Sequence, residues 1–182
     1  MSEFEQSFST ECNSNYSLNM DFKVIDSISK TINRVIEKHK HLPNYLKIVN
    51  SQKNNKFSTS TIPKIPINNY LSRIERYSEI EKNTLIIALI YIDKFCQMSN
   101  IILTPFNVHR ILFCAILTSI KYNEDQIYEF KYYAKIAGIS IKELQELESE
   151  FLDSLNFSLY VDNDLFLQYQ TYLYKLLAKS EK

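Results

Sequence analysis

Apolar residues recur at helical spacing along most of the chain, and polar segments separate the periodic stretches. The first stretch predicts an N-terminal amphipathic helix over residues 21–42, with its apolar positions at Phe22, Ile25, Ile28, Ile32, Val35 and Ile36. Residues 1–20 are rich in Ser, Asn and Glu without a period, so we expect a flexible N-terminal arm. Residues 43–66 are polar and end with two prolines, which predicts a linker or irregular loop.

The pattern over residues 67–160 predicts five helices in close succession, and one more helix lies within residues 161–182, capped by Asp162 or Asn163. The second of the five has the sequence TLIIALIYIDKF, which is apolar nearly all round. In a soluble protein such a pattern indicates a central, buried helix. The chain is therefore predicted to be all-α.

Short polar signals mark several helix ends. Ser78 with Glu81, and Ser140 with Glu143, have the spacing of a capping box, in which side chains satisfy the first free amides of a helix. Gly138 follows an aromatic helix and is predicted to end it in the left-handed conformation.

Composition supports the fold prediction and narrows the range of possible functions. The chain has 182 residues, of which 45% are hydrophobic, so one domain with a core and additional arms can form. A single glycine and four prolines exclude collagen-like classes and strand-rich folds with many glycine turns. The 21 basic and 21 acidic residues give a net charge of zero, which argues against a partner with a phosphate backbone.

The cysteines and apolar runs indicate the compartment. Cys12, Cys96 and Cys114 are an odd number without paired spacing, which is typical of a reduced, intracellular protein. Residues 1–10 lack the apolar core of a signal peptide, and no apolar run reaches the roughly 20 residues that span a bilayer. We expect a soluble protein of the cytoplasm or nucleus that does not bind membranes.

Motifs for catalysis, metal binding and phosphate binding are absent from the sequence. His39 and His41 are two residues apart, so on a helix they point about 200° away from each other. No Cys-x-x-Cys, His-Glu-x-x-His or glycine-rich phosphate loop occurs. We expect no catalysis, no cofactor and no metal ion.

Two charged residues interrupt apolar stretches. Glu148 lies within the apolar stripe of the fifth helix, and Lys121 follows the apolar body of the third. Burial of an unpaired carboxylate is costly, so a cation or a partner surface should lie nearby. One interpretation is a lysine favoured by the helix C-terminus and a glutamate at the edge of the stripe. The other places both on an exposed face, where they offer hydrogen bonds to another protein.

Asp93 and Arg110 also lie at the ends of apolar segments. An internal ion pair or cap that fixes the helices explains them best, with Arg110 or Arg73 as the partner of Asp93.

Two aromatic residues differ from the many that fall at helical core spacing. Tyr122 and Phe157 each follow a helix end, where a ring is easily exposed. Exposed rings beside charges are typical of protein interfaces.

Four segments between Ile67 and about Leu159 carry motifs in a fixed order: LIIALIYIDKF, LTPFNVHRILFCAILTSIKYNED, YYAKIAGIS and ELQELESEFLDSLNFSLYV. YIDKF resembles the Tyr-Ile-Asp-Arg-Phe segment of cyclins, with Lys94 in place of the usual arginine. NVHR, YAKIAGIS and LESEFLDSLNF resemble motifs of the P/U-type cyclins, which partner phosphate-system cyclin-dependent kinases. Ala137 replaces a common glycine of these cyclins.

The resemblance implies a five-helix cyclin box over residues 67–160, with the third helix (about 105–122) at its centre and docked against a kinase. In cyclins a lysine and a glutamate face the regulatory helix of the kinase. The corresponding residues here are Lys121 and Glu148, the two that interrupt the apolar pattern.

Further contacts are implied by the same resemblance. Tyr122, Phe157 and Leu159 match apolar positions that contact the kinase. Asp125 matches an acidic position near the kinase activation loop, where it would replace a phosphate by pairing with arginines.

As the resemblance implies, the protein is a regulatory subunit that forms a heterodimer with a cyclin-dependent protein kinase and activates it. The substrate-docking patch of cell-cycle cyclins, Met-Arg-Ala-Ile-Leu with a following Trp, is absent, and Tyr70 falls near that Trp. Neither recruitment of Arg-x-Leu motifs nor a second cyclin box is expected. The alternatives are a cyclin-fold interaction scaffold without a kinase, a nucleic-acid-binding cyclin-box transcription factor and a small helical enzyme.

Overall fold

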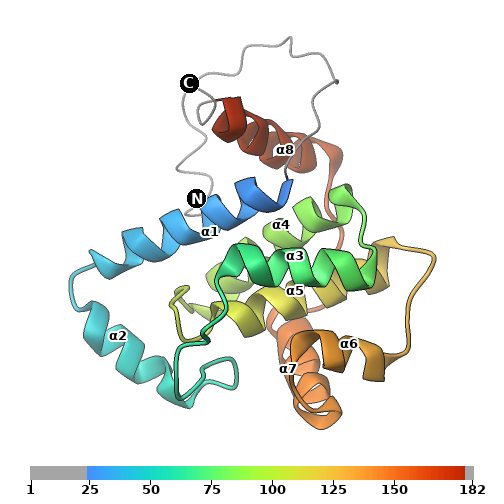
Figure 1. Ribbon diagram of the computed structural model, residues 1–182. Coiled ribbons are helices and arrows are strands. Elements are labelled where there is room, and N and C mark those ends of the chain that lie inside the picture. The colour runs from blue at the N-terminus through green and yellow to red at the C-terminus, as the bar shows by residue number, and fades with distance from the viewer. Residues whose placement is uncertain (1–23, 179–182) are drawn as a thin grey trace.

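The computed structural model describes residues 24–178, which fold into a bundle of α-helices (Figure 1). The helices are α1 (Val24–Lys40), α2 (Tyr45–Ser51), α3 (Ile67–Ser78), α4 (Lys82–Ser99), α5 (Val108–Asn123), α6 (Phe130–Ala137), α7 (Ile141–Ser154) and α8 (Asn163–Ala178). A 3₁₀ turn follows α2, and the described part of the chain contains no strand. The all-α prediction is confirmed. The predicted arm over residues 1–20, with Cys12, lies outside the described residues.

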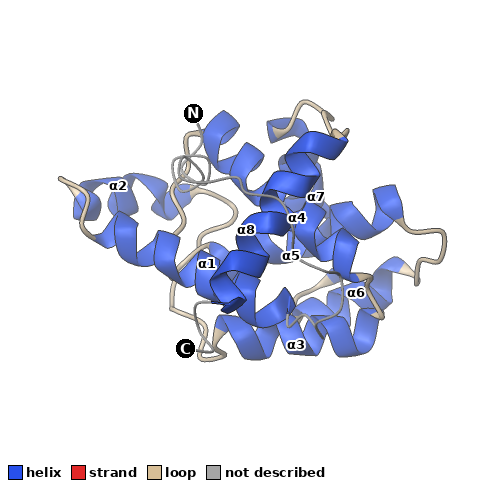
Figure 2. Ribbon diagram, turned by 90° about the horizontal axis from the view of Figure 1, so that it is seen from above, coloured by secondary structure: helices blue, strands red, loops and turns tan. Residues whose placement is uncertain are grey.

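The helices α4 and α5 form the centre of the bundle. Every residue from Ile111 to Ile120 in α5 is buried, as is every residue from Ala88 to Asp93 in α4. A helix buried on all sides needs neighbours on all sides. In Figure 1, α6 and α7 lie below this pair, while α1 and α8 lie above it. Figure 2 shows α8 crossing over α1 and α4, both of which it contacts.

Three helix ends follow the sequence prediction. The Ser140 hydroxyl accepts a hydrogen bond from the Glu143 amide at 3.1 Å, which caps α7. Gly138 has φ 77° and ends α6 in the left-handed conformation. The Asp162 carboxylate accepts from the Leu165 amide at 2.8 Å, at the start of α8. These ends fix where α6, α7 and α8 begin and turn.

The capping box expected at Ser78 and Glu81 is wrong. Ser78 is the last residue of α3, and its hydroxyl donates to the Ile74 carbonyl at 2.8 Å. Glu79 has φ 52° and ends α3, so the chain turns after Ser78 rather than before it. Glu81 is the N-cap of α4, and its own side chain makes no capping hydrogen bond.

The segment 43–66, expected as a linker or irregular loop, contains α2 and an anchored loop. No residue of α2 is buried, whereas Phe57 in the loop is fully buried, with 0% of its surface exposed. The centroid of its ring lies 4.9 Å from that of Phe95 in α4 and 6.3 Å from that of Phe151 in α7. One aromatic side chain therefore packs this loop onto the bundle.

The partners expected for Asp93 are wrong. The buried Asp93 carboxylate accepts hydrogen bonds from the Gln97 amide at 2.9 Å and from the Tyr169 hydroxyl at 2.7 Å. Tyr169 belongs to α8, so the carboxylate ties α4 to the C-terminal helix. Its partner is a hydroxyl 76 positions away, which the local pattern of charges does not reveal.

The arginines proposed as partners of Asp93 bond elsewhere. Arg110 forms an ion pair with Glu143 of α7 and donates to two backbone carbonyls of the loop that carries Phe57, at 2.9 Å each. Arg73 donates to the Lys135 carbonyl at 3.0 Å. Both arginines fasten one element of the bundle to another.

Over residues 24–178, no helix combines the length and the apolar character needed to cross a membrane. The same stretch brings together no group of three His, Cys, Asp or Glu side chains that could hold a metal ion.

Candidate protein-interaction face

Lys121 and Glu148 meet between the end of α5 and the middle of α7. Because α5 is buried through Ile120, Lys121 is the first residue to reach the surface. In α7, Leu147 and Phe151 face the core, and Glu148 lies at the edge of that stripe. The Lys121 Nζ lies 2.9 Å from Glu148 Oε1, so the two residues that interrupt the apolar pattern form one ion pair.

The two partners of this pair differ in exposure. The Lys121 side chain is 40% exposed, and the Glu148 side chain is 12% exposed. The Lys121 ammonium also lies 5.6 Å from the centroid of the Phe130 ring, a cation–π distance. The carboxylate and the ring orient the lysine, while part of its side chain remains exposed to a partner. Both interpretations of the sequence hold in part, since Glu148 lies at the stripe's edge and the pair reaches the surface.

Exposed aromatic rings accompany this pair. Tyr122, directly after Lys121, is 54% exposed, and Phe157, beyond the end of α7, is 64% exposed. Asn156 and Phe157 have φ 49° and 56°, in the left-handed region that residues with a side chain rarely adopt. The Phe157 amide donates to the Leu152 carbonyl at 3.1 Å, which holds the turn. A strained turn that exposes a large ring is a feature of functional surfaces.

Leu159 is placed differently from Tyr122 and Phe157, because its side chain is half-buried against the core. Its carbonyl accepts from the Tyr91 hydroxyl at 2.7 Å, and the next carbonyl, of Tyr160, accepts from Lys94 Nζ at 3.0 Å. Burial raises the pKa of Tyr91 to about 12 and lowers that of Lys94. Two residues of the YIDKF segment in α4 thus hold the chain that displays Phe157.

Sequence reasoning missed Tyr160 as a surface residue. Its ring is 73% exposed, more than that of Phe157. Tyr160 falls outside any helix, so helical periodicity gave no signal for its exposure. Tyr160 therefore extends the exposed aromatic surface beyond α7.

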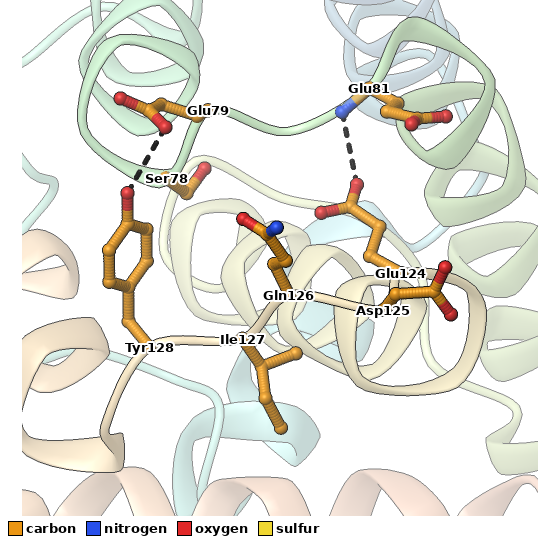
Figure 3. Close-up of a pocket in the computed structure, with 8 residues that line it drawn as sticks. All are labelled: Ser78, Glu79, Glu81, Glu124, Asp125, Gln126, Ile127 and Tyr128. Atoms are coloured by element: carbon orange, nitrogen blue, oxygen red, sulfur yellow. Dashed lines mark hydrogen bonds between the residues drawn. The ribbon is translucent and has the colours of Figure 1, made fainter.

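Asp125 lies in a pocket of about 420 Å³, whose lining includes none of the other five predicted residues. Figure 3 shows its acidic neighbours: the Glu124 carboxylate accepts from the Glu81 amide at 3.0 Å, and Glu79 accepts from the Tyr128 hydroxyl at 3.2 Å. The hydrogen bond to Glu79 raises the pKa of Tyr128. Asp125 itself is exposed, and no side chain or amide within residues 24–178 bonds its carboxylate. It is available to a cation from outside.

The face thus combines a partly open ammonium, a carboxylate and exposed rings, from α5, α7 and the chain that follows α7. Such a set offers hydrogen bonds and apolar area, as the central parts of protein interfaces do. The structure brings Lys121 and Glu148 into contact and places Asp125 apart from them.

Comparison with known proteins agrees with this architecture. The sequence pattern of the cyclin family matches residues 22–159. The chain is 34% identical over 156 residues to cyclin-U4-3 of Arabidopsis thaliana, covering 85% of this chain and 68% of that protein. It is 39% identical over 120 residues to Arabidopsis cyclin-U2-1, covering 64% and 53%. It is 31% identical over 147 residues to cyclin-P3-1 of Oryza sativa subsp. japonica, covering 81% and 61%. The chain spans between half and about two thirds of the length of these relatives.

Proposed function

Because the chain belongs to the cyclin family, among its P/U-type members, we propose that it binds a cyclin-dependent protein kinase and activates it. Members of this family are non-catalytic regulators, so the proposed activity resides in the kinase and the chain changes its conformation.

The observation that carries this proposal is the Lys121–Glu148 pair at the surface, 2.9 Å between Nζ and Oε1. An ammonium has three donors and uses one on Glu148, so others are available to backbone carbonyls of the kinase. The carboxylate of Glu148 keeps acceptor capacity for a kinase amide or cation. Hydrogen bonds of this kind set orientation and specificity more than affinity.

Apolar contact would supply most of the affinity. Tyr122 and Phe157 are more than half exposed, and burying such rings in a partner gives the large energies typical of interface hot spots. Leu159, half-buried, would complete the apolar surface at its edge. Because Tyr91 and Lys94 hold the segment after α7 at Leu159 and Tyr160, the backbone next to Phe157 loses little conformational freedom on binding.

Activation follows if this face fits one kinase conformation better than another. A ligand shifts an equilibrium only by its difference in affinity for the two states. We propose that the face binds the kinase with its regulatory helix turned inward, so that the kinase's Lys–Glu ion pair forms. Asp125, exposed and without an internal partner among the described residues, would pair with arginines of the activation loop in place of a phosphate.

The test is co-purification from the source extract of tagged wild type and of Lys121→Ala/Glu148→Ala, with protein kinase activity measured in each eluate. The matched control is Lys56→Ala/Glu150→Ala, because this second pair also has a 2.9 Å contact and also involves α7. Exposed ion pairs contribute about 0–1 kcal/mol, so both double variants should remain folded.

We expect kinase activity with wild type and with the control variant, and its loss with Lys121→Ala/Glu148→Ala. Absence of activity from all three eluates would contradict the proposal and leave the cyclin-fold scaffold. Equal activity in all three would show that a different face binds the kinase.

A further inference from the structure

A groove of about 600 Å³ lies between α3 and α6. The side chains that matter for its chemistry are Arg73, Arg76 and Tyr77 of α3, and Tyr132, Lys135 and Ile136 of α6. Within each helix these residues are one, three or four positions apart, so each helix contributes one face to the groove. The groove is therefore built by the packing of two helices and not by a loop.

The charge of this groove is positive and uncompensated. Arg73, Arg76 and Lys135 line it, and no acidic residue does. Over residues 24–178, no carboxylate lies within ion-pair distance of these three cations, whereas Lys40, Lys56, Arg110, Lys121, Lys131 and Lys142 all have acidic partners there. Clustered like charges repel one another, and an anion that enters the groove removes this repulsion.

The walls of the groove are preformed. The Tyr132 hydroxyl donates to the Tyr77 carbonyl at 3.0 Å, and Arg73 reaches across to the Lys135 carbonyl at 3.0 Å. The Arg76 guanidinium lies 5.7 Å from the centroid of the Tyr77 ring, a cation–π distance that orients both groups. These contacts link α3 to α6 and keep the charged groups beside aromatic surface.

Apolar area accompanies the charges. Tyr77 is 46% exposed, Tyr132 is half-buried, and Ile136 is buried, with 4% of its surface exposed. A partner that fits therefore carries both anionic groups and a side chain that packs on the tyrosines. An inorganic anion would use only the first of these features.

We propose that this groove binds an acidic peptide segment of another protein, in which Asp or Glu residues flank an aromatic or aliphatic residue. The arginine forks pair with carboxylates in the bidentate manner, and Lys135 pairs with a third acidic group. The central side chain packs on Tyr77 and Tyr132. Binding at this groove does not require the kinase proposed above.

The groove and the Lys121–Glu148 face use opposite sides of α6. Phe130, which lies beneath the Lys121 ammonium, is two positions before Tyr132, a rotation of about 200° around the helix. One chain can therefore hold a kinase at Lys121 and an acidic segment in the groove at the same time. If the proposed function holds, the segment belongs to a substrate or regulator that is brought to the kinase.

The test is fluorescence anisotropy of the full chain with two fluorescein-labelled peptides. The acidic probe is Glu-Glu-Tyr-Leu-Glu-Asp, and the neutral control is Gln-Gln-Tyr-Leu-Gln-Asn. We expect saturable binding of the acidic probe, about tenfold or more tighter than the control, and weaker at higher salt.

Two matched triple variants locate the binding site. Arg73→Ala/Arg76→Ala/Lys135→Ala should weaken binding of the acidic probe about tenfold or more. A second variant carries Ala at exposed Lys38, Lys53 and Lys142, which removes the same charge elsewhere and should change binding less than twofold. Circular dichroism melts check that both variants fold.

A single charge reversal gives an independent measurement. Arg76→Glu, at an exposed position, lowers the charge of the three groove positions from +3 to +1 and should weaken binding of the acidic probe about tenfold or more. Equal binding of the acidic and neutral probes, or an equal loss in the two triple variants, would overturn the proposal. Because no kinase takes part, failure here is distinct from failure of the proposed function.

Discussion

Two lysine–glutamate pairs share α7 and are alike in geometry but not in surroundings. Lys121–Glu148 and Lys56–Glu150 both have a 2.9 Å contact. The first lies at the end of the buried run of α5, and the residue after Lys121, Tyr122, is exposed. The second lies beside the fully buried Phe57, on a loop that Arg110 also fastens to the bundle. The same ion pair therefore belongs to a candidate binding face in one place and to a structural attachment in the other.

The contrast shows that an ion pair does not indicate a function by itself. What distinguishes the pairs is the aromatic residue that directly follows each lysine, because Tyr122 is 54% exposed and Phe57 is 0% exposed. Exposed apolar area carries binding energy, and buried apolar area carries folding energy. Substitutions at Phe57, Phe157 and the two lysines separate these two contributions.

The largest effect is expected on folding, from Phe57→Ala. Its ring packs against Phe95 and Phe151, so its removal leaves a cavity and should lower the free energy of unfolding by roughly 3 kcal/mol or more. Phe157→Ala should leave the melting temperature nearly unchanged, because its ring is mostly in water. Thermal melts followed by circular dichroism compare the two. Similar melting temperatures for both variants would contradict the assignment of Phe57 to folding and of Phe157 to binding.

The next effect is on kinase binding, from Phe157→Ala. Loss of a ring buried only in the complex should weaken the affinity for the co-purified kinase by about 2 kcal/mol, or roughly 30-fold. Surface plasmon resonance with the immobilised kinase measures this. Leu46→Ala is the control, since Leu46 in α2 is 75% exposed and lies away from the proposed face. Unchanged affinity for Phe157→Ala would remove this residue from the interface.

A smaller effect on kinase binding distinguishes Lys121 from Lys56. Lys121→Ala should weaken kinase binding by about tenfold, because its hydrogen bonds to the kinase are lost, while Lys56→Ala should have no measurable effect. Lys56→Ala should alter the free energy of unfolding by no more than about 1 kcal/mol, because its pair with Glu150 is exposed. Lys121→Ala should cost more, because it leaves the largely buried Glu148 carboxylate without its cation. Isothermal titration of the kinase into each variant gives the affinities. A loss that is equal for the two lysines would mean that general charge, not this face, determines binding.

The smallest effect is expected on the pH dependence of stability, through His109, which holds the loop before α3. His109 donates from Nε2 to the Ile65 carbonyl at 2.9 Å, while its buried Nδ1 has no partner among residues 24–178. Burial lowers the pKa of His109 below its usual 6.5. The unfolded chain therefore takes up a proton at a higher pH than the folded one, so stability is full above about pH 7 and falls as the pH drops through 6.5 and below.

Urea unfolding at pH 7.5 and pH 5.5 tests this pH dependence. Wild type should lose more stability between the two conditions than His109→Gln, which cannot take up the proton. Equal losses would show that other groups cause the acid sensitivity.

Regular elements with a long apolar period were predictable from the sequence. The helices α3 to α7 follow the pattern of apolar residues, and Ser140 and Gly138 mark ends as expected. The short α2 was missed because it buries no residue and so leaves no apolar period. Ser78 was misjudged because Glu79 takes a left-handed conformation that only the folded chain reveals.

The candidate face was predictable in part. Lys121 and Glu148 were singled out because charge replaced expected apolar residues, and the resemblance to cyclins gave them a role. The partner of Asp93 and the groove of Arg73 and Lys135 were not predictable, because each depends on two helices that are distant in sequence coming together. Periodicity gives the face of one helix and not the helix that covers it.

The most direct test of the central claim is a titration of the co-purified kinase with wild type, with Lys121→Ala/Glu148→Ala and with Lys56→Ala/Glu150→Ala, followed by phosphate transfer to a substrate. We predict the same half-maximal concentration for wild type and the Lys56→Ala/Glu150→Ala variant, and an increase of about tenfold or more for Lys121→Ala/Glu148→Ala. Identical titration curves for the two double variants would contradict it.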